Sequence, residues 1–293
     1  MKILNFGSCN IDYVYSVPHF VLPGETLAAT ELNIFPGGKG LNQSIAVANA
    51  GCRVFHAGCI GNDGIFLKEL LESKNVNTDF LSVGSEKTGH AIIEVDENGE
   101  NRIILFSGAN AKIDEQMIDR VLDNFCENDI LLLQNEISCR NYLLKKAKER
   151  NLTVVFNPAP FTSDITCDLI SNVSYLIVNK TEAFNLTGEK EIDLIIKKIR
   201  SDFPKCKVVV TFGKDGCYYF DDKQIIKQNA FNVKAVDTTA AGDTFIGYFI
   251  AGIANNIPIK ENLRISCMAS AICVTKLGAS TAIPTISEVK EKL

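Results

Sequence analysis

The chain has 293 residues, of which 46% are hydrophobic and 22% charged, and its formal net charge is -5 at pH 7. This composition predicts a globular protein with a large core, and no apolar run approaches the ~20 residues that a membrane-spanning helix needs. The acidic balance and the dispersed Lys and Arg residues argue against nucleic acid or an anionic membrane as a partner.

Apolar, β-rich runs alternate with helical patterns along most of the chain. The runs that predict strands are residues 3–7, 53–61, 130–136, 153–159, 175–180 and 207–213. Helical patterns lie between them, most clearly at residues 64–75 and 141–151. This alternation predicts an α/β fold with a central, mostly parallel sheet flanked by helices. The N-terminal segment has a single Lys and becomes polar by position 8, so it lacks the apolar region expected of a secretory signal.

Two stretches interrupt this alternation. Residues 11–35 have strand character without a helix, and residues 88–106 predict a hairpin around the turn sequence DENGEN. Together they predict a small β appendage. From about residue 242 the pattern becomes helical to the end, and no linker divides the chain, so one domain over residues 1–293 is expected.

Ten cysteines are scattered through the chain without a CxxC pair, and three histidines stand apart from them. A disulfide-stapled secreted domain would show closer spacing, so we expect reduced thiols in a cytoplasmic protein. A zinc site has little support.

Ligands of open α/β sheets bind beyond the carboxyl ends of the strands. Polar or small residues that follow a predicted strand or open a predicted helix are therefore site candidates. They are Asn10, Asp12, Glu136, Asn157, Asn179, Gly213 and Asp243.

The sequence DTTAAGD at residues 237–243 precedes a strongly apolar helix. Ala240, Ala241 and Gly242 offer backbone N–H groups at the helix N-terminus without obstructing side chains, as a phosphoryl oxygen requires. Asp243 in the same turn could take a proton from an attacking hydroxyl. Alternatively, Asp243 only caps the helix.

A second glycine-rich segment, GGKGLNQ at residues 37–43, also precedes a helix rich in small residues. Gly37 and Gly38 could allow a polyhydroxylated ligand close to the backbone, while Lys39 and Asn42 could bond its hydroxyls. It lacks the Walker A pattern, and such a segment alone can also be a flexible turn.

Three weaker signals complete the candidates. Asn10 and Asp12 share one side of the chain and suit vicinal hydroxyls, or form a turn. Glu182, one helical turn after Asn179, could orient Mg²⁺ through water, although capping by a neighbouring Asn or Thr explains the segment equally well. Residues 211–216 could cradle a nucleotide phosphate or ribose, or be only a turn.

In this order the segments resemble the ribokinase-like carbohydrate kinase family over nearly the whole chain. The motifs that carry the resemblance are NID (10–12), PGET (23–26), GGKGLNQ (37–43), QNE (134–136), NPAP (157–160), NKTE (179–182), TFGKDG (211–216), DTTAAGDTF (237–245) and VTKLGA (274–279).

The resemblance implies an ATP-dependent kinase that phosphorylates the primary hydroxyl of a sugar, with D-ribose, giving ribose 5-phosphate, as the expected substrate. It also implies a β lid formed by about residues 12–36 and 88–107, and a homodimer through that lid. ATP, Mg²⁺ and a monovalent cation such as K⁺ are the implied cofactors.

The resemblance also assigns roles to residues. It makes Asp243 the catalytic base and Ala240, Ala241 and Gly242 the anion hole. The implied sugar ligands are Asn10, Asp12, Gly38, Lys39, Asn42 and Glu136. The implied nucleotide contacts are Asn179, Thr211, Phe212, Gly213, Lys214, Asp215, Gly216, Gly242 and Cys267. Glu182 would organise Mg²⁺, and the monovalent cation would lie near Asp237, Thr239, Cys273, Lys276 and Gly278.

The chain departs from the family pattern at Ala282, at Cys267 and at Ala240, where a glycine is more usual. Ala282 stands where a serine often contributes to the cation site, so K⁺ activation could be weaker or be met differently. Cys267 stands where an asparagine often borders the adenine, which bears on nucleotide preference.

Other functions remain as alternatives. A kinase for deoxyribose, a ketose or a nucleoside would differ only in pocket shape, and a non-catalytic sugar or nucleotide sensor could share the fold. A dinucleotide-dependent oxidoreductase is disfavoured because no G-x-G-x-x-G follows the first strand.

Overall fold

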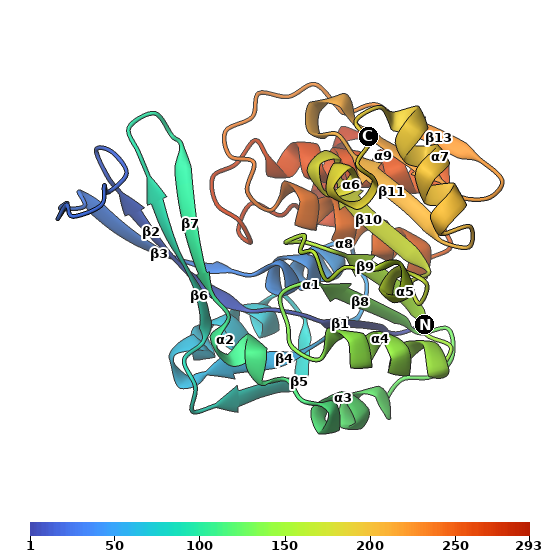
Figure 1. Ribbon diagram of the computed structural model, residues 1–293, viewed down its shortest axis with the longest axis horizontal. Coiled ribbons are helices and arrows are strands. Elements are labelled where there is room, and N and C mark those ends of the chain that lie inside the picture. The colour runs from blue at the N-terminus through green and yellow to red at the C-terminus, as the bar shows by residue number, and fades with distance from the viewer.

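The computed structural model describes the backbone of residues 1–293 and every side chain except that of Cys167. Figure 1 shows a layered body and a small sheet that projects from it. The nine-stranded sheet of the body has the order β13-β12-β11-β10-β9-β8-β1-β4-β5. Its strands are β1 (Ile3–Phe6), β4 (Val54–Gly61), β5 (Asn77–Gly84), β8 (Ile130–Gln134), β9 (Thr153–Asn157), β10 (Tyr175–Asn179), β11 (Lys207–Thr211), β12 (Cys217–Phe220) and β13 (Ile225–Gln228).

The first seven of these strands pair in parallel, and β12 and β13 form an antiparallel edge. The predicted mostly parallel sheet is therefore confirmed, and all six predicted strands are present. The strands β5, β12 and β13 were not predicted.

Helices cover both faces of the sheet because successive strand residues point to opposite sides. In β8, Ile130 and Leu132 pack on one layer and Leu131 and Leu133 on the other. One layer contains α1 (Lys39–Asn49), α2 (Ile65–Ser73), α8 (Ala241–Ala254) and α9 (Ile259–Cys273), with α10 (Ile286–Lys292) against α9. The other contains α3 (Glu115–Leu122), α4 (Arg140–Glu149), α5 (Cys167–Ile170), α6 (Lys180–Thr187) and α7 (Ile192–Asp202).

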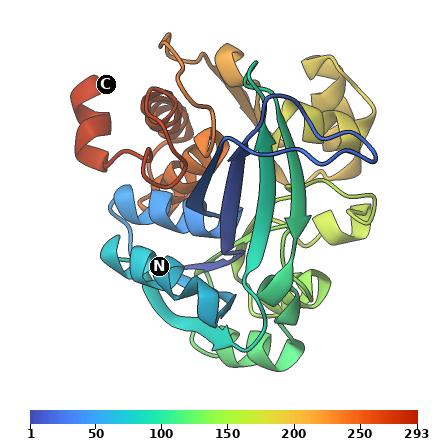
Figure 2. The same cartoon turned by 90° about the vertical axis from the view of Figure 1, so that its left-hand side faces the viewer.

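The projecting sheet, called the lid below, consists of β2 (Asn10–Ser16), β3 (Glu31–Gly37), β6 (Gly89–Val95) and β7 (Asn101–Phe106). Its order is β3-β2-β6-β7, with antiparallel outer pairs and a parallel central pair. Figure 2 views the lid from its free side. The predicted hairpin around DENGEN is the β6–β7 connection.

The helices α1 and α8 approach each other closely. A Cβ atom at Gly247 in α8 would lie 2.3 Å from the Cβ atom of Ala46 in α1, so only glycine fits there. This contact brings the beginnings of the two helices, which carry the two glycine-rich motifs, to the same edge of the sheet. Within the described chain, no helix is both long enough and apolar enough to cross a bilayer.

Candidate active site

Asp243 lies in the first turn of α8, and its carboxylate receives two side-chain amides from α1. Asn42 Nδ2 donates to Asp243 Oδ2 at 3.0 Å, and Gln43 Nε2 donates to Asp243 Oδ1 at 2.8 Å. The two motifs that are 200 residues apart in sequence therefore meet at one carboxylate. No bond from the Asp243 side chain to the backbone of its own helix is found among the described residues, which disfavours the capping alternative.

The turn before Asp243 presents an open backbone. Ala240 adopts the left-handed conformation (φ 59°) that leads the chain into α8, a conformation that costs a residue with a Cβ atom about 1–2 kcal/mol. A Cβ atom built at Gly242 would meet no described atom within 4 Å. The Ala241 N–H already makes a long bond of 3.3 Å to the Thr238 carbonyl. The predicted anion-binding turn is thus uncrowded, with Gly242 as its most accessible member.

Lys39 and Glu136 form an ion pair beside this turn. Lys39 Nζ lies 3.2 Å from Glu136 Oε1, and the Lys39 backbone N–H donates to Glu136 Oε2 at 3.1 Å. Ser8 Oγ also donates to Glu136 Oε2. These contacts fix a carboxylate whose side chain is only 6% exposed.

Asn10 and Asp12 lie in β2, not in a turn, two residues apart and on the same face of the lid. Asn110 Nδ2 donates to Asn10 Oδ1 at 2.8 Å and holds that side chain in place. Gly37 and Gly38 have no room for a side chain, because other parts of the chain lie close beside them. A Cβ atom at Gly37 would lie 2.1 Å from Asp12 Oδ2, and one at Gly38 (φ 95°) would lie 2.9 Å from the Asn10 nitrogen.

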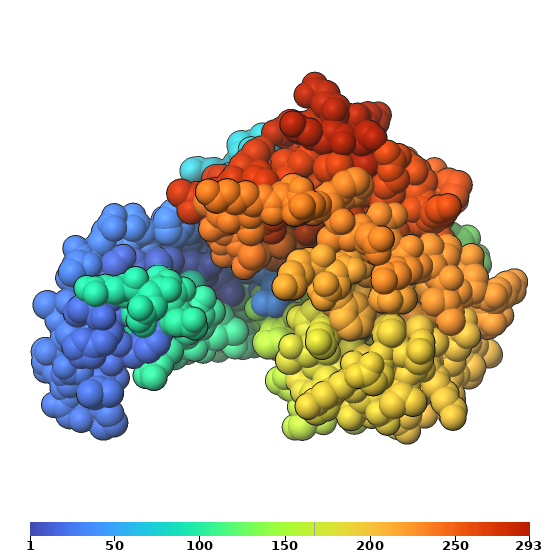
Figure 3. Space-filling model, turned by 90° about the horizontal axis from the view of Figure 1, so that it is seen from above, coloured from blue at the N-terminus to red at the C-terminus, as the bar shows by residue number. Residues whose placement is uncertain are grey.

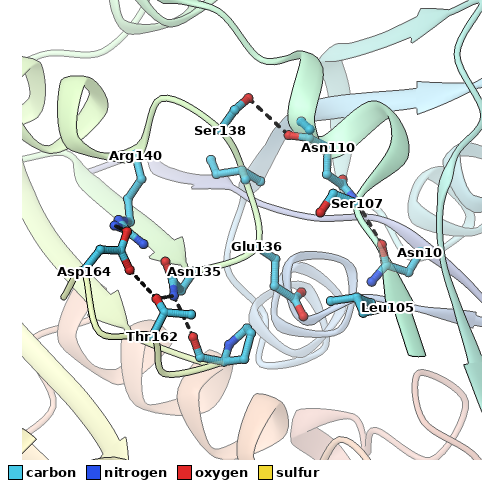
Figure 4. Close-up of a pocket in the computed structure, with 13 residues that line it drawn as sticks. Asn10, Leu105, Ser107, Asn110, Asn135, Glu136, Ser138, Arg140, Thr162 and Asp164 are labelled. Carbon is cyan, nitrogen blue, oxygen red and sulfur yellow. Dashed lines mark hydrogen bonds and ion pairs between the residues drawn. The ribbon is translucent and has the colours of Figure 1, made fainter. Parts of the chain in front are cut away.

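A cavity of about 420 Å³ lies between the lid and the body, and Figure 4 shows its lining. Asn10 and Glu136 point into it from opposite sides, and Leu105 of β7 borders it. At its far end Arg140 forms an ion pair of 2.7 Å with Asp164. The space-filling view in Figure 3 shows the hollow that separates the lid from the C-terminal part of the body.

Two further cavities continue toward the C-terminal half. One, of about 180 Å³, is bordered by Lys39, Asn157, Asn179, Glu182 and Asp243. A larger one, of about 510 Å³, lies between the β11–β12 turn, residues 230–235 and α9. Both are lined by Thr211 and Gly242, so they meet at the N-terminus of α8. Asp243 therefore lies in the smaller cavity, next to the point where that cavity meets the larger one.

The larger cavity contains most of the residues that the resemblance relates to the nucleotide. Its lining includes Thr211, Gly213, Lys214, Asp215, Gly216, Gly242 and Cys267. Phe212 does not line it, because its ring packs edge-on against Tyr218 at 5.7 Å. The floor carries a pair of thiols, since Cys217 Sγ and Cys267 Sγ are 3.7 Å apart.

Glu182 and Asn179 form a capping box at the start of α6. Glu182 Oε2 accepts the Asn179 backbone N–H at 2.9 Å, and Asn179 Oδ1 accepts the Glu182 N–H at the same distance. The capping explanation of this segment is thus correct, yet the 7%-exposed Glu182 also borders the cavity of Asp243.

The segment proposed for a monovalent cation is held together by Asp237. Its carboxylate accepts the N–H groups of Thr239 at 2.9 Å and Gly278 at 3.0 Å, which joins the loop before α8 to the loop after α9. Lys276 pairs with Glu288 at 2.7 Å, and Cys273 is buried with its Sγ 3.8 Å from the Thr239 carbonyl oxygen. Among the described side chains, no group of three or more His, Cys, Asp or Glu residues is placed to hold a metal.

Burial dominates the electrostatics of the site. It raises the pKa of Asp12 to about 6, with Glu136 adding to the rise and Lys39 opposing it. Burial also raises the pKa of Asp243, while Lys39 and the amides of Gln43 and Asn42 act in the opposite direction. For Lys39 burial lowers the pKa, but Glu136 and Asp243 outweigh it, so its pKa is above the ordinary value.

Several residues of the site were not predicted from the sequence. Ser8, Asn110 and Arg140 contact or line the site but lie in segments without a distinctive pattern. Gln43 was quoted within GGKGLNQ without a role. Its contact with Asp243 depends on how α1 meets α8, which no local pattern reveals.

The chain is similar to known proteins over nearly its whole length. The family model for pfkB family carbohydrate kinases matches residues 1–286. The chain is 37% identical to the ribokinase of Haemophilus influenzae, over 98% of this chain and 96% of that protein. Among solved structures, it is similar to the ribokinase of Cryptococcus neoformans in complex with ADP (TM-score 0.86, 36% identity, 100% and 99% coverage). It is also similar to the ribokinase of Arabidopsis thaliana complexed with ribose and ATP (TM-score 0.89, 28% identity, 99% and 97% coverage).

Proposed function

The chain belongs to the pfkB family of carbohydrate kinases, and on that basis we propose that it transfers the γ-phosphoryl group of ATP to the primary 5-hydroxyl of D-ribose. The observation that carries this proposal is the position of Asp243. Its carboxylate lines the 180 Å³ cavity beside Lys39, and this cavity meets the larger cavity of the nucleotide motif at Gly242. A sugar hydroxyl and a terminal phosphate would meet there.

In this proposal Asp243 accepts the proton of the hydroxyl as its oxygen attacks phosphorus. The backbone N–H groups of Gly242, Ala241 and Ala240 hold the oxygens of the transferred group, favoured by the dipole of α8. Phosphoryl transfer needs little covalent participation of the protein, so catalysis comes mainly from positioning and charge stabilisation. The open space at Gly242 supports this role.

The remaining residues bind the two substrates. The sugar ligands are Asn10, Asp12, Gly38, Lys39, Asn42 and Glu136. The missing side chain of Gly38 also allows the chain after β3 to approach Asn10. Thr211, Gly213, Lys214, Asp215, Gly216 and Cys267 line the nucleotide cavity, and Asn179 borders the adjoining one.

Two cations complete the proposed site. Mg²⁺, which supplies charge neutralisation for the transferred phosphoryl group, would be organised through water by Glu182. This fits a buried carboxylate at the wall of the Asp243 cavity. A monovalent cation would lie near Asp237, Thr239, Cys273, Lys276 and Gly278, whose loops the Asp237 carboxylate joins. Ala282 brings no hydroxyl to that site, so we expect modest K⁺ activation.

We also propose a cytoplasmic homodimer. The nine cysteines with described side chains are all free thiols, as expected in a reducing compartment. The lid offers the dimer surface, because its outward face exposes Ile34, Ile92 and Ile104 in one cross-strand row.

A coupled ADP-release assay over pentoses, hexoses and nucleosides, each with and without K⁺, tests this function. We expect D-ribose to give the highest kcat/KM. We expect K⁺ to raise kcat/KM less than tenfold, because one cation ligand is missing; a tenfold change in rate corresponds to about 1.4 kcal/mol. Higher kcat/KM with deoxyribose, a ketose or a nucleoside would overturn the choice of sugar. ADP release that no acceptor accelerates would overturn the kinase itself and favour a sensor.

A further inference from the structure

A chain of buried side-chain amides leads from Asp243 into the core between α1 and the sheet. Gln43, Gln134 and Asn5 are each at most 1% exposed. Gln43 Nε2 bonds Asp243 Oδ1 at 2.8 Å, and Gln134 Nε2 donates to Gln43 Oε1 at 2.7 Å. The same Gln134 nitrogen donates to Asn5 Oδ1 at 3.0 Å.

The chain ends on helix α1 and strand β4. Asn5 Nδ2 donates to the Gly40 carbonyl at 2.7 Å and to Ser44 Oγ at 2.8 Å. Ser44 Oγ lies 2.8 Å from His56 Nδ1. Burial lowers the pKa of His56 to about 4, so this ring is neutral at physiological pH and can accept the Ser44 proton. Every link therefore has a donor and an acceptor.

The charge of Asp243 determines the direction of the whole chain. An ionised carboxylate only accepts, so Gln43 must present its NH₂ group to Asp243 and its oxygen to Gln134. Gln134 must then use its NH₂ group toward Gln43, and Asn5 is oriented in the same way. A flipped Gln43 would place its oxygen against Asp243 and its NH₂ group against the donor of Gln134.

This orientation lowers the stability of the core. Gln134 Oε1 is buried without a partner among the described atoms, which costs about 1–3 kcal/mol for a neutral acceptor. Gly7 leaves the space for this amide, because a Cβ atom there would lie 2.5 Å from Gln134 Oε1. A requirement for stability alone would favour an apolar core at this place.

We propose that Gln43 is a positioning residue for the catalytic base, held by the amide chain Gln134–Asn5 so that its NH₂ group orients the Asp243 carboxylate toward the sugar hydroxyl and keeps it ionised. This inference rests on the proposed role of Asp243. Gln43 Nε2 also donates to Asn157 Oδ1 at 3.3 Å. It does not line any of the three cavities.

The loss of the Gln43 donor has a defined electrostatic consequence. The charged groups that face Asp243 are Lys39 from α1, Glu136 from the loop after β8 and Glu182 from α6. These charged groups remain when Gln43 is replaced. Burial raises the pKa of Asp243, and Lys39, Gln43 and Asn42 lower it, so the variant loses one of the three groups that lower this pKa. A hydrogen bond to a charged group contributes about 1.5–3 kcal/mol, which corresponds to about one to two pH units. In the pH profile of kcat, the limb on the acid side should therefore move to higher pH by that amount.

The test compares Gln43→Met with the wild-type chain. We expect kcat at pH 7.5 to fall about 10- to 100-fold, because the base is no longer oriented. The acid limb of the kcat profile should move up by about one to two pH units, and the sugar Kd from calorimetry should change less than about threefold. An acid limb that lies within about 0.3 pH units of the wild-type limb would overturn the inference, because this difference corresponds to only about 0.4 kcal/mol.

Two further variants separate positioning from folding. Gln43→Glu keeps the shape of the side chain and places a second carboxyl beside Asp243, so it should move the acid limb up at least as far. It tests the inference even if Gln43→Met does not fold. The matched control is Asn262→Leu, which removes an equally buried amide that donates only to the Phe249 carbonyl. The control should lower Tm without moving the acid limb.

The failures of the two proposals are distinguishable. A wild-type chain that releases no ADP with any sugar contradicts the proposed function. A wild-type chain with sugar-dependent turnover, together with folded Gln43 variants whose acid limbs match it, contradicts only the positioning role.

Discussion

Asp12 is a carboxylate of the proposed sugar site whose pKa is raised toward working pH. Burial, reinforced by Glu136, raises its pKa to about 6. A carboxylate accepts two vicinal hydroxyls, whereas its protonated form loses part of that capacity. We therefore expect the sugar KM to rise as pH falls through 6, with little change in the KM for ATP. Steady-state kinetics from pH 5 to 8.5 measure this, and Asp12→Asn should show a high sugar KM without the pH dependence.

The same pKa shift predicts that the ionised form of Asp12, which binds the sugar, lowers the stability of the fold. A carboxyl whose pKa is higher in the folded state than in the unfolded chain destabilises the fold at high pH. The penalty is full above pH 6 and disappears as pH falls below about 4, near the ordinary Asp value. Asp12→Asn should therefore raise Tm at pH 8 and leave it unchanged near pH 4. A Tm gain that is the same at both pH values would contradict this explanation.

Single residues show where sequence reasoning succeeds and where it stops. The first turn of α8 could be predicted because Gly and Ala before an acidic residue at a helix start serve a recognisable chemistry. Asn42 was predicted for the sugar, and the structure adds a bond from its amide to Asp243. Gln43, Gln134 and Asn5 could not be connected from sequence, since their contacts join segments about 90 to 200 residues apart.

At the scale of elements, the contact between α1 and α8 determines the geometry of the site. Gly247 lies one helical turn beyond Asp243, and Ala46 lies one turn beyond Asn42. Gly247→Ala would place two Cβ atoms 2.3 Å apart and push the helices away from each other. We expect a loss of about 1–3 kcal/mol in the free energy of unfolding, and a lower kcat from the displaced carboxylate.

Denaturant titration and steady-state assays measure these two effects. Gly84→Ala is the control, because the nearest described atom to its added Cβ would be at 4.0 Å. Equal stabilities of the Gly247 and Gly84 variants would show that the helix contact tolerates the extra methyl group.

The elements themselves were largely predictable. Buried parallel strands are continuous apolar runs, and the hairpin turn DENGEN has strong turn residues, so their patterns are local. The strands β12 and β13 are only four residues each, and β5 contains the polar sequence NTDF. Such short or mixed segments become strands because a neighbouring strand offers backbone hydrogen bonds, which sequence alone does not show.

At the scale of the whole molecule, the lid has two faces with different chemistry. The row Asp12, Phe35, Ala91 and Leu105 belongs to the face that borders the site, and the adjacent row Tyr13, Ile34, Ile92 and Ile104 to the opposite face. Ile34 and Ile104 are 55% and 67% exposed. An exposed apolar row on a free sheet favours association with a second copy.

We therefore expect the double variant Ile34→Asp/Ile104→Asp to shift the proposed homodimer toward a monomer of 32.1 kDa. Light scattering after gel filtration measures the mass. Ile225→Asp alters an equally exposed residue (51%) at the other end of the molecule, on β13, and should leave the mass unchanged. A wild-type protein that is already monomeric at micromolar concentration would contradict the dimer.

The Asp243 carboxylate is the proposed base of phosphoryl transfer. Asp243→Asn retains the shape of the side chain and removes its capacity to accept the proton. Turnover and sugar affinity, measured on the same preparation, test this most directly. We expect a kcat about 10²- to 10⁴-fold lower than wild type, with a sugar Kd changed by no more than a few-fold. A kcat within about tenfold of wild type would contradict this proposal.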